Sequence, residues 1–102
     1  MAGGMEAVLK KMCNRFLKSF VVVAELSSIN QAAAKLKSSP TAIMRQMDVL
    51  EENLGITLFV RSNHGVKLTA AGEYFYRQAK DIISRCDRIL RETKKIQERE
   101  AS

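Results

Sequence analysis

The sequence has few cysteines, prolines and glycines: two, one and five among 102 residues, with no tryptophan. Long apolar runs are also missing, because the longest, Phe20–Ala24, has five residues, whereas a membrane helix needs about 20. The segment up to Cys13 lacks the apolar stretch of a secretory signal. We therefore expect a protein that is not exported, does not enter a membrane and works in the cytoplasm with reduced cysteines.

Recognisable catalytic sets are absent as well. The sequence offers no Ser/His/acid set, no paired-carboxylate cleft and no glycine loop after a strand that would hold a phosphate. Two cysteines 73 positions apart and a single histidine, His64, do not make a metal site. We expect no enzyme, no cofactor and no metal.

The charge balance is basic, with 17 Lys and Arg against 11 Asp and Glu, a net charge of +6 and a pI near 9.6. The excess is spread out: residues 1–60 carry seven basic and five acidic groups, and residues 61–102 carry ten and six. Such a balance permits a polyanionic partner without proving one.

Apolar spacing and capping residues predict three helices in the first half of the chain. After a flexible segment 1–4, an apolar stripe with steps of three and four begins at Met5 and predicts a helix that ends near Leu26. Ser28 is a good N-cap for a second helix over Ile29–Lys37. Ser39 then caps a third helix that begins at Pro40 and ends at Leu54, before Gly55.

The pattern then changes from helical to strand-like. The runs 57–61 and 66–68 are β-prone and enclose a polar turn with Asn and Gly, which predicts a small hairpin. Thr69 is a suitable cap for a last helix that runs to about Glu98.

The last helix carries a heptad seam, with apolar or small residues at alternating steps of four and three. The seam consists of Phe75, Ala79, Ile82, Cys86, Ile89, Thr93 and Ile96, widened on one side by Tyr76, Ile83 and Leu90. A body of about 65 residues cannot cover such a stripe along its whole length, so part of it must pair with a second copy. We expect a homodimer joined through this helix.

The order helix, helix, tight turn, helix, hairpin and long helix is typical of a winged helix-turn-helix with a dimerisation arm. The fold class is thus mainly α with a small β-hairpin. The expected units are a flexible N-terminus (1–4), a winged helix-turn-helix domain (5–68) and a linker or dimerisation helix (69–102). In such a unit the third helix, about 40–54, enters the major groove of DNA, and the hairpin, about 58–68, is the wing.

Many residues between Phe20 and Gly72 stand at the spacing of one known family. They are Phe20–Glu25, Ser28, Ala32-Ala33, Leu36, Ser39, Arg45–Met47, Leu50-Glu51, Leu54-Gly55, Leu58-Phe59, Arg61, Leu68-Thr69 and Gly72. This segment resembles the DNA-binding domain of LysR-type transcriptional regulators.

The resemblance implies a transcription regulator that binds double-stranded DNA at an inverted repeat and whose linker helices pair antiparallel. It also implies that members carry a C-terminal effector-binding domain, which these 102 residues cannot hold. The chain is then either a piece of a longer protein or a naturally minimal member.

Helix order and resemblance together give a set of candidate DNA-binding residues, on the second and third helices, the turn between them and the wing. The set is Asn30, Ser38, Ser39, Pro40, Thr41, Ala42, Met44, Arg45, Arg61, His64 and Lys67. The candidate dimerisation residues are Phe75, Ala79, Ile82, Ile83, Cys86, Ile89, Leu90 and Thr93.

Each candidate has an alternative interpretation. Ser39 is a helix cap or a phosphate ligand, and Arg61 contacts phosphate or braces the wing internally. Met44 stands where the family usually has serine, so it either contacts a base methyl or packs. Arg45 and His64 are DNA contacts or merely solvated. Cys86 is a small packing residue or, facing its own copy, half of an intermolecular disulfide.

A second function class fits the same pattern. A winged helix that has lost DNA contact and pairs through its last helix would be a protein-interaction module. Met44 and the modest charge of residues 1–60 favour this alternative slightly. Salt-sensitive binding to DNA separates the two, because phosphate contacts weaken steeply with salt.

Overall fold

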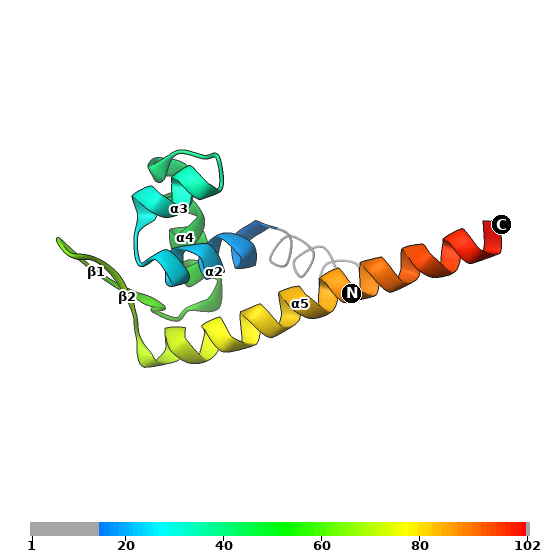
Figure 1. The fold of residues 1–102 in the computed structure, drawn as a ribbon. Helices are drawn as coiled ribbons and strands as arrows, with labels where there is room; N and C mark the ends of the chain where they lie inside the picture. Colours follow the sequence, from blue (N-terminus) through cyan, green and yellow to red (C-terminus); the bar gives the residue numbers. More distant parts are fainter. Residues whose placement is uncertain (1–14, 102) are drawn as a thin grey trace.

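The computed structural model describes residues 15–101 as a three-helix body, a hairpin beside it and one long helix beneath it (Figure 1). The elements in chain order are α2 (Leu17–Leu26), α3 (Ile29–Lys35), α4 (Pro40–Leu54), β1 (Phe59–Ser62), β2 (Gly65–Leu68) and α5 (Ala70–Ala101). The expected fold class is confirmed. The flexible segment 1–4 and the beginning of the first expected helix lie outside the described residues.

Helix α3 begins as predicted and ends two residues early. The Ser28 hydroxyl oxygen accepts a hydrogen bond from the Gln31 amide at 3.1 Å, which caps its first turn. At the other end Lys37 adopts a left-handed conformation (φ 54°), and the Ser38 amide bonds back to the Ala33 carbonyl at 2.9 Å. This closure is a Schellman motif with lysine where glycine is usual, so the sequence offered no signal for it.

Helix α4 has the predicted boundaries. The Ser39 hydroxyl oxygen accepts from the Ala42 amide at 3.1 Å, and Pro40 occupies the first turn, where no amide hydrogen is needed. Gly55 ends the helix in a left-handed conformation (φ 67°) and donates to the Glu51 carbonyl at 2.8 Å. Local signals alone were sufficient here.

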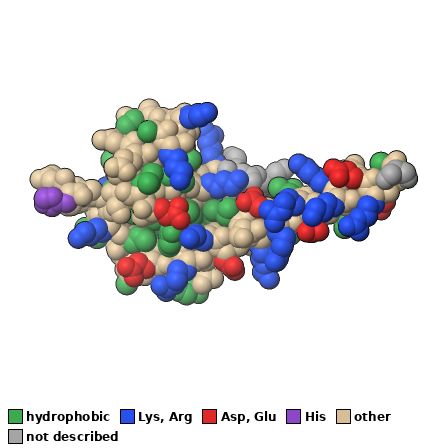
Figure 2. All heavy atoms as spheres, in the orientation of Figure 1, with side chains coloured by type: hydrophobic (Ala, Val, Ile, Leu, Met, Phe, Trp, Pro, Cys, Tyr) green, Lys and Arg blue, Asp and Glu red, His purple; other side chains and the backbone are tan. Residues whose placement is uncertain are grey.

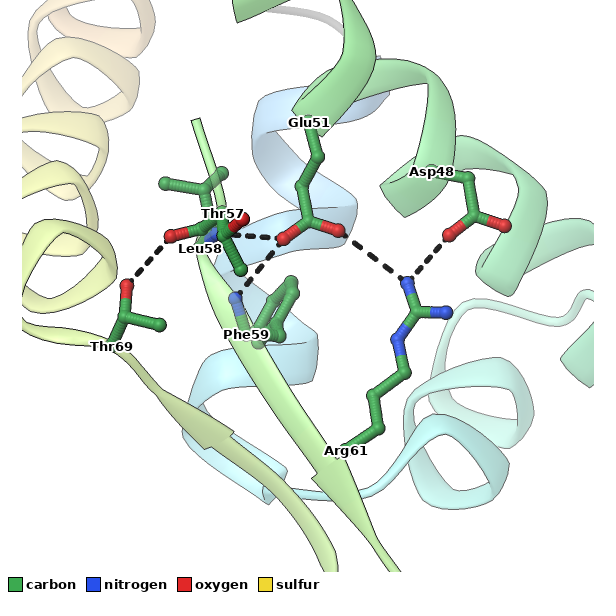
Figure 3. Close-up of polar contacts among 7 residues, drawn as sticks. All are labelled: Asp48, Glu51, Thr57, Leu58, Phe59, Arg61 and Thr69. Atoms are coloured by element: carbon green, nitrogen blue, oxygen red, sulfur yellow. Dashed lines mark hydrogen bonds and ion pairs between the residues drawn. The ribbon is translucent and has the colours of Figure 1, made fainter. Parts of the chain in front are cut away.

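The hairpin is shifted relative to the prediction. Its strands pair antiparallel from Phe59 opposite Leu68 to Ser62 opposite Gly65, so the turn has two residues rather than four. The expected start at Thr57 is wrong because the Leu58 and Phe59 amides donate to the Glu51 carboxylate, at 2.6 and 3.1 Å, instead of to a strand (Figure 3).

Helix α5 starts where the hairpin ends. The Thr69 hydroxyl accepts from the Gly72 amide at 2.9 Å and donates to the Thr57 carbonyl at 2.8 Å. The helix runs three residues beyond Glu98, to Ala101. Gly72 allows a close approach, since a Cβ at this position would collide with the Leu58 carbonyl.

One core joins all elements of the body. It contains Leu17, Phe20, Val23, Ala32, Ala33, Ile43, Met47, Leu50, Leu58, Phe59, Val66 and Ala79. The Phe20 ring lies at the centre, with centroids 5.2 Å from those of both Phe59 and Phe75. Hence the wing and α5 are fastened to α2 by aromatic packing, and the orientation of α4 and the hairpin is fixed by the same core.

Candidate nucleic-acid interface

The outward face of α4 is the first part of the candidate interface. Ile43 and Met47 are buried at 1% and 0% exposure, so the helix turns the residues between them outward. Thr41, Met44 and Arg45 are exposed there, and Met44 keeps 39% of its surface accessible. These three side chains share a shallow hollow with Asp48 and Val49.

The turn before α4 and the beginning of α3 flank this face. Ser38, Ser39 and Pro40 are exposed. The Ser39 side chain is a cap, as one of its two interpretations had it, although its exposure still permits a ligand. Ala42 is half-buried. Asn30 is exposed and borders a second hollow, between α4 and the wing, together with Met44 and Asn63.

Arg61 connects the wing to α4. Its Nη2 lies 2.6 Å from Asp48 Oδ1 and 3.6 Å from Glu51 Oε1 (Figure 3). The Arg61 side chain is 36% exposed and that of Glu51 only 18%. The structure therefore gives Arg61 the internal bracing role that was one of its two interpretations.

The wing is also tied to the turn between α2 and α3. The Val66 amide donates to the Ser27 carbonyl at 3.1 Å. Gly65 has a φ of +114°, and a Cβ there would lie 2.6 Å from the same carbonyl oxygen. His64 and Lys67 remain exposed on the hairpin. The wing is thus held by α4 through Arg61 and by the turn between α2 and α3, while the His64 and Lys67 side chains stay exposed.

A polar cluster holds α5 against α2. The Tyr76 hydroxyl donates to Glu25 Oε2 at 2.9 Å, and Lys80 Nζ lies 3.5 Å from that oxygen and 5.4 Å from the Tyr76 ring centroid. The pKa of Tyr76 is raised above its ordinary value. Burial is the largest cause, and the hydrogen bond to Glu25 and the negative charge of Glu25 are the next two. The hydrogen bond to Tyr76 is the largest cause that raises the pKa of Lys80.

The heptad seam of α5 divides into two halves. Ala79 is 1% exposed, and Phe75, Tyr76 and Ile83 pack against the same core. In the other half Cys86 is half-buried, and four large apolar residues are exposed: Ile82 at 43%, Ile89 at 59%, Leu90 at 58% and Ile96 at 54%. Thr93 is exposed, with its hydroxyl bonded to the Ile89 carbonyl at 2.7 Å. In Figure 2 charged side chains of both signs surround apolar ones along this half.

Asp48 and Glu51 are the positioning residues that sequence reasoning missed. Both lie on α4. Asp48 contacts Arg61, which is 13 positions further along the chain, and Glu51 contacts Leu58, which is seven positions further. No spacing rule links residues across a change from helix to strand. Only the helical periodicity of α4, which turns Ile43, Met47 and Leu50 inward, indicated that Asp48 points outward.

None of the helices within residues 15–101 is both long and apolar enough to cross a bilayer. The same range brings together no group of three His, Cys, Asp or Glu side chains that would hold a metal ion.

Residues 15–73, more than half of the chain, match the family described as bacterial regulatory helix-turn-helix protein, lysR family. The chain belongs to the LysR family. The match includes α2, α3, α4, the hairpin and the first turn of α5, so it covers every element that borders the candidate interface.

Curated LysR relatives are much longer than this chain. The chain is 45% identical over 69 residues to the HTH-type transcriptional regulator TcbR of Pseudomonas sp. (strain P51), which covers 68% of this chain and 24% of TcbR. It is 40% identical over 82 residues to the HTH-type transcriptional regulator BenM of Acinetobacter baylyi, covering 80% of this chain and 27% of BenM. The chain thus spans about a quarter of the length of these relatives.

Solved structures of LysR-family domains share the fold. The BenM domain, crystallised with catB site 1 DNA, superposes with a TM-score of 0.78 at 40% identity, covering 80% of this chain and 92% of that one. The CbnR domain in its DNA complex has a TM-score of 0.78 at 39% identity, covering 80% and 94%. Both domains are almost completely covered by the match.

Proposed function

We propose that this LysR-family chain binds double-stranded DNA sequence-specifically, as a dimer, at an inverted repeat. The observation that carries the proposal is the outward face of α4: Thr41, Met44 and Arg45 are exposed beside one another on a helix that the core holds rigidly. The similar BenM and CbnR domains were solved with DNA, which supports the same role here.

The exposed residues of α4 suit base edges in the major groove. An arginine donates two parallel hydrogen bonds to guanine, and methyl-bearing side chains contact the thymine methyl. We assign the first role to Arg45 and the second to Thr41, Ala42 and Met44. Met44 has no hydroxyl, so its contribution to recognition is apolar.

Phosphate contacts are assigned to the residues around this face. Asn30, Ser38 and Ser39 lie at or just before the beginnings of α3 and α4, and His64 and Lys67 lie on the wing. Pro40 has no N–H to donate, so its contact with the DNA backbone is apolar. Phosphate contacts fix the register of a protein on the duplex and make binding salt-dependent. Arg61 takes part as a positioning residue, since its guanidinium is engaged by Asp48.

The exposed half of the α5 seam is assigned to dimerisation. Phe75, Ala79 and Ile83 pack in or against the core of their own protomer. The dimer contact is therefore assigned to the remaining seam residues, which are Ile82, Cys86, Ile89, Leu90, Thr93 and Ile96. Four large apolar side chains in one stripe, each more than 40% exposed, cost free energy in water. Pairing with a second copy removes this cost.

The organisation that follows is a DNA-binding unit over residues 5–68 and a dimerising helix over residues 69–102. DNA binding places the protein with the genome, in the bacterial cytoplasm. We assign neither a catalytic role nor effector sensing to any residue of the chain.

A gel shift against genomic fragments at two salt concentrations tests DNA binding. We expect a shift that weakens steeply with salt, and an Arg45→Ala loss of about 1–3 kcal/mol with relaxed preference at one position. Arg45→Lys is the matched control, because it keeps the charge and loses the planar fork. Absent or salt-insensitive binding would favour the protein-interaction module instead.

Sedimentation equilibrium tests dimerisation. Ile89→Glu places a charge in the exposed seam and is expected to give a monomer, whereas Ser84→Glu adds the same charge on the opposite side of α5 and is expected to leave the dimer intact. A wild-type chain that stays monomeric at high concentration would contradict this part of the proposal.

A further inference from the structure

Three cationic side chains surround one hollow on the side of α4 away from the wing. Arg15 and Lys18 lie on consecutive turns at the beginning of the described chain, and Lys37 lies in the turn between α3 and α4. Together with Ser38 they line a hollow of about 330 Å³. Figure 2 shows Lys and Arg side chains following one another from the top of the three-helix body toward the start of α2. We call Arg15, Lys18 and Lys37 the cationic flank.

No carboxylate of the described part of the chain neutralises the cationic flank. The ion pairs of the helical body and the wing engage Arg61 and Lys80, with Asp48, Glu51 and Glu25 as their partners. All three side chains of the flank are exposed. Three positive charges around one hollow, with no carboxylate partner among residues 15–101, repel one another, and an anion placed among them removes that repulsion.

The cationic flank is continuous with the outward face of α4. Arg15 also lines the neighbouring hollow of about 420 Å³, together with Ser39, Thr41 and Arg45. Across α4, the hollow on the wing side is bordered by Asn30, Met44 and Asn63, with Arg61 as its one cationic lining residue. The helix therefore has a surface on each side, one formed by the cationic flank and one by the wing.

A helix in the major groove has a phosphate strand on either side, because the groove is only about 12 Å wide. The wing serves one strand. We infer that the cationic flank binds the phosphates of the other strand, so that Arg15, Lys18 and Lys37 add positive charge beside Ser38, the assigned phosphate-contact residue that lines the same hollow. The inference rests on the proposed DNA binding and adds a definite group of residues to it.

The flank supplies affinity rather than sequence preference. A phosphate oxygen accepts hydrogen bonds from lysine or arginine wherever it lies along the duplex, so these contacts do not distinguish bases. Each phosphate neutralised contributes about 0.9 to the slope of log affinity against log salt. Three contacts contribute a slope of about 2 to 3 for each protomer, and so about 5 for a dimer on two half-sites.

The test uses the full chain and a duplex recovered from a random DNA pool, with binding followed by fluorescence anisotropy at several salt concentrations. The variant is Arg15→Gln/Lys18→Gln/Lys37→Gln. The matched control, Arg77→Gln/Arg91→Gln/Lys95→Gln, removes three charges from the side of α5 opposite to the seam. We expect the slope to fall by about 2 to 3 for each protomer, and so by about 5 for the dimer, in the variant and by less than 1 in the control, with the preferred sequence unchanged. Circular dichroism melting establishes that both fold.

A second measurement locates the contact on the DNA. Uncharged methylphosphonate linkages are placed on the strand beside the cationic flank. They are expected to weaken wild-type binding much more than binding of the triple variant, which keeps only the Ser38 contact on that side.

The two outcomes that contradict the inference differ. If the wild type binds its duplex and the triple variant has the same slope and the same methylphosphonate sensitivity, the flank does not touch DNA and the proposed function stands. If the wild type selects no duplex at all, the proposed function falls and the inference falls with it.

Discussion

The Arg61 guanidinium lies 2.6 Å from the Asp48 carboxylate and joins the wing to the helix that presents the candidate interface. Exposed ion pairs contribute about 0.2–1 kcal/mol, and the two side chains are 36% and 56% exposed. The contact therefore matters more for the angle of the wing than for stability.

A double-mutant cycle measures this contact. We expect Arg61→Ala and Asp48→Ala to couple by about 0.2–1 kcal/mol in the free energy of unfolding, obtained from urea denaturation. Arg61→Ala is expected to weaken DNA binding across all sequences, because the wing loses its position. Purely additive effects on both unfolding and binding would show that the pair positions nothing.

Glu51 is expected to be the more important stabilising residue. Its Oε2 accepts from both the Leu58 and the Phe59 amides, in a partly buried place. Glu51→Ala leaves two donors unsatisfied and should cost about 1–3 kcal/mol in the free energy of unfolding. The neighbouring Glu52→Ala, at an exposed position, should stay within about 0.5 kcal/mol.

Glu51→Gln refines this prediction. The amide keeps an oxygen acceptor and loses the charge, so we expect an intermediate loss of stability. Equal stability of the alanine variant and the wild type would contradict the role given to Glu51.

Two glycines form a matched pair. Gly55 has a φ of +67° and open space around its missing Cβ, whereas Gly65 has a φ of +114° and the Ser27 carbonyl 2.6 Å from that position. Gly55→Ala should cost about 1 kcal/mol, from the left-handed conformation alone. Gly65→Ala should cost at least about 2 kcal/mol, because strain and collision add. Thermal melting of the two variants in parallel checks the order, and the reverse order would refute it.

The packing of α5 on α2 should weaken in alkali. The fold raises the pKa of both Tyr76 and Lys80, so it binds their protons more tightly than the unfolded chain does. The stabilisation is complete below the ordinary tyrosine pKa of about 10 and is lost as the pH rises through the raised value.

Absorbance of tyrosinate in a Tyr74→Phe variant measures this effect, because Tyr76 is then the single titrating tyrosine. We expect a midpoint above that of a blocked tyrosine in solution. Glu25→Gln removes the charge beside the hydroxyl and should move the midpoint downward. A midpoint at or below the reference would contradict the effect of burial and Glu25.

Signals carried by adjacent residues predicted much of this fold. Ser39, Pro40 and Gly55 gave the boundaries of α4, because caps and left-handed glycines act within one turn of the chain. The early end of α3 escaped prediction, since Lys37 adopts a conformation that its residue type does not favour. The strand start was misplaced because Glu51 takes the amides of Leu58 and Phe59.

The site was predictable to a similar degree. The outward direction of Met44 and Arg45 follows from the periodicity of α4. The bracing of Arg61 by Asp48 does not, because it depends on where the hairpin packs. For α5 the heptad spacing described one stripe, and only the packing shows that Phe75 and Ala79 belong to the core while Ile89 remains exposed.

Selection of bound duplexes from a random DNA pool is the decisive measurement of sequence-specific binding by a dimer. We predict that the wild-type chain enriches an inverted repeat whose half-sites are centred about one helical turn, or a multiple of it, apart. We also predict that Arg45→Ala relaxes one position in each half. A pool that remains random after selection, at a salt concentration where the chain is folded and dimeric, would contradict sequence-specific binding.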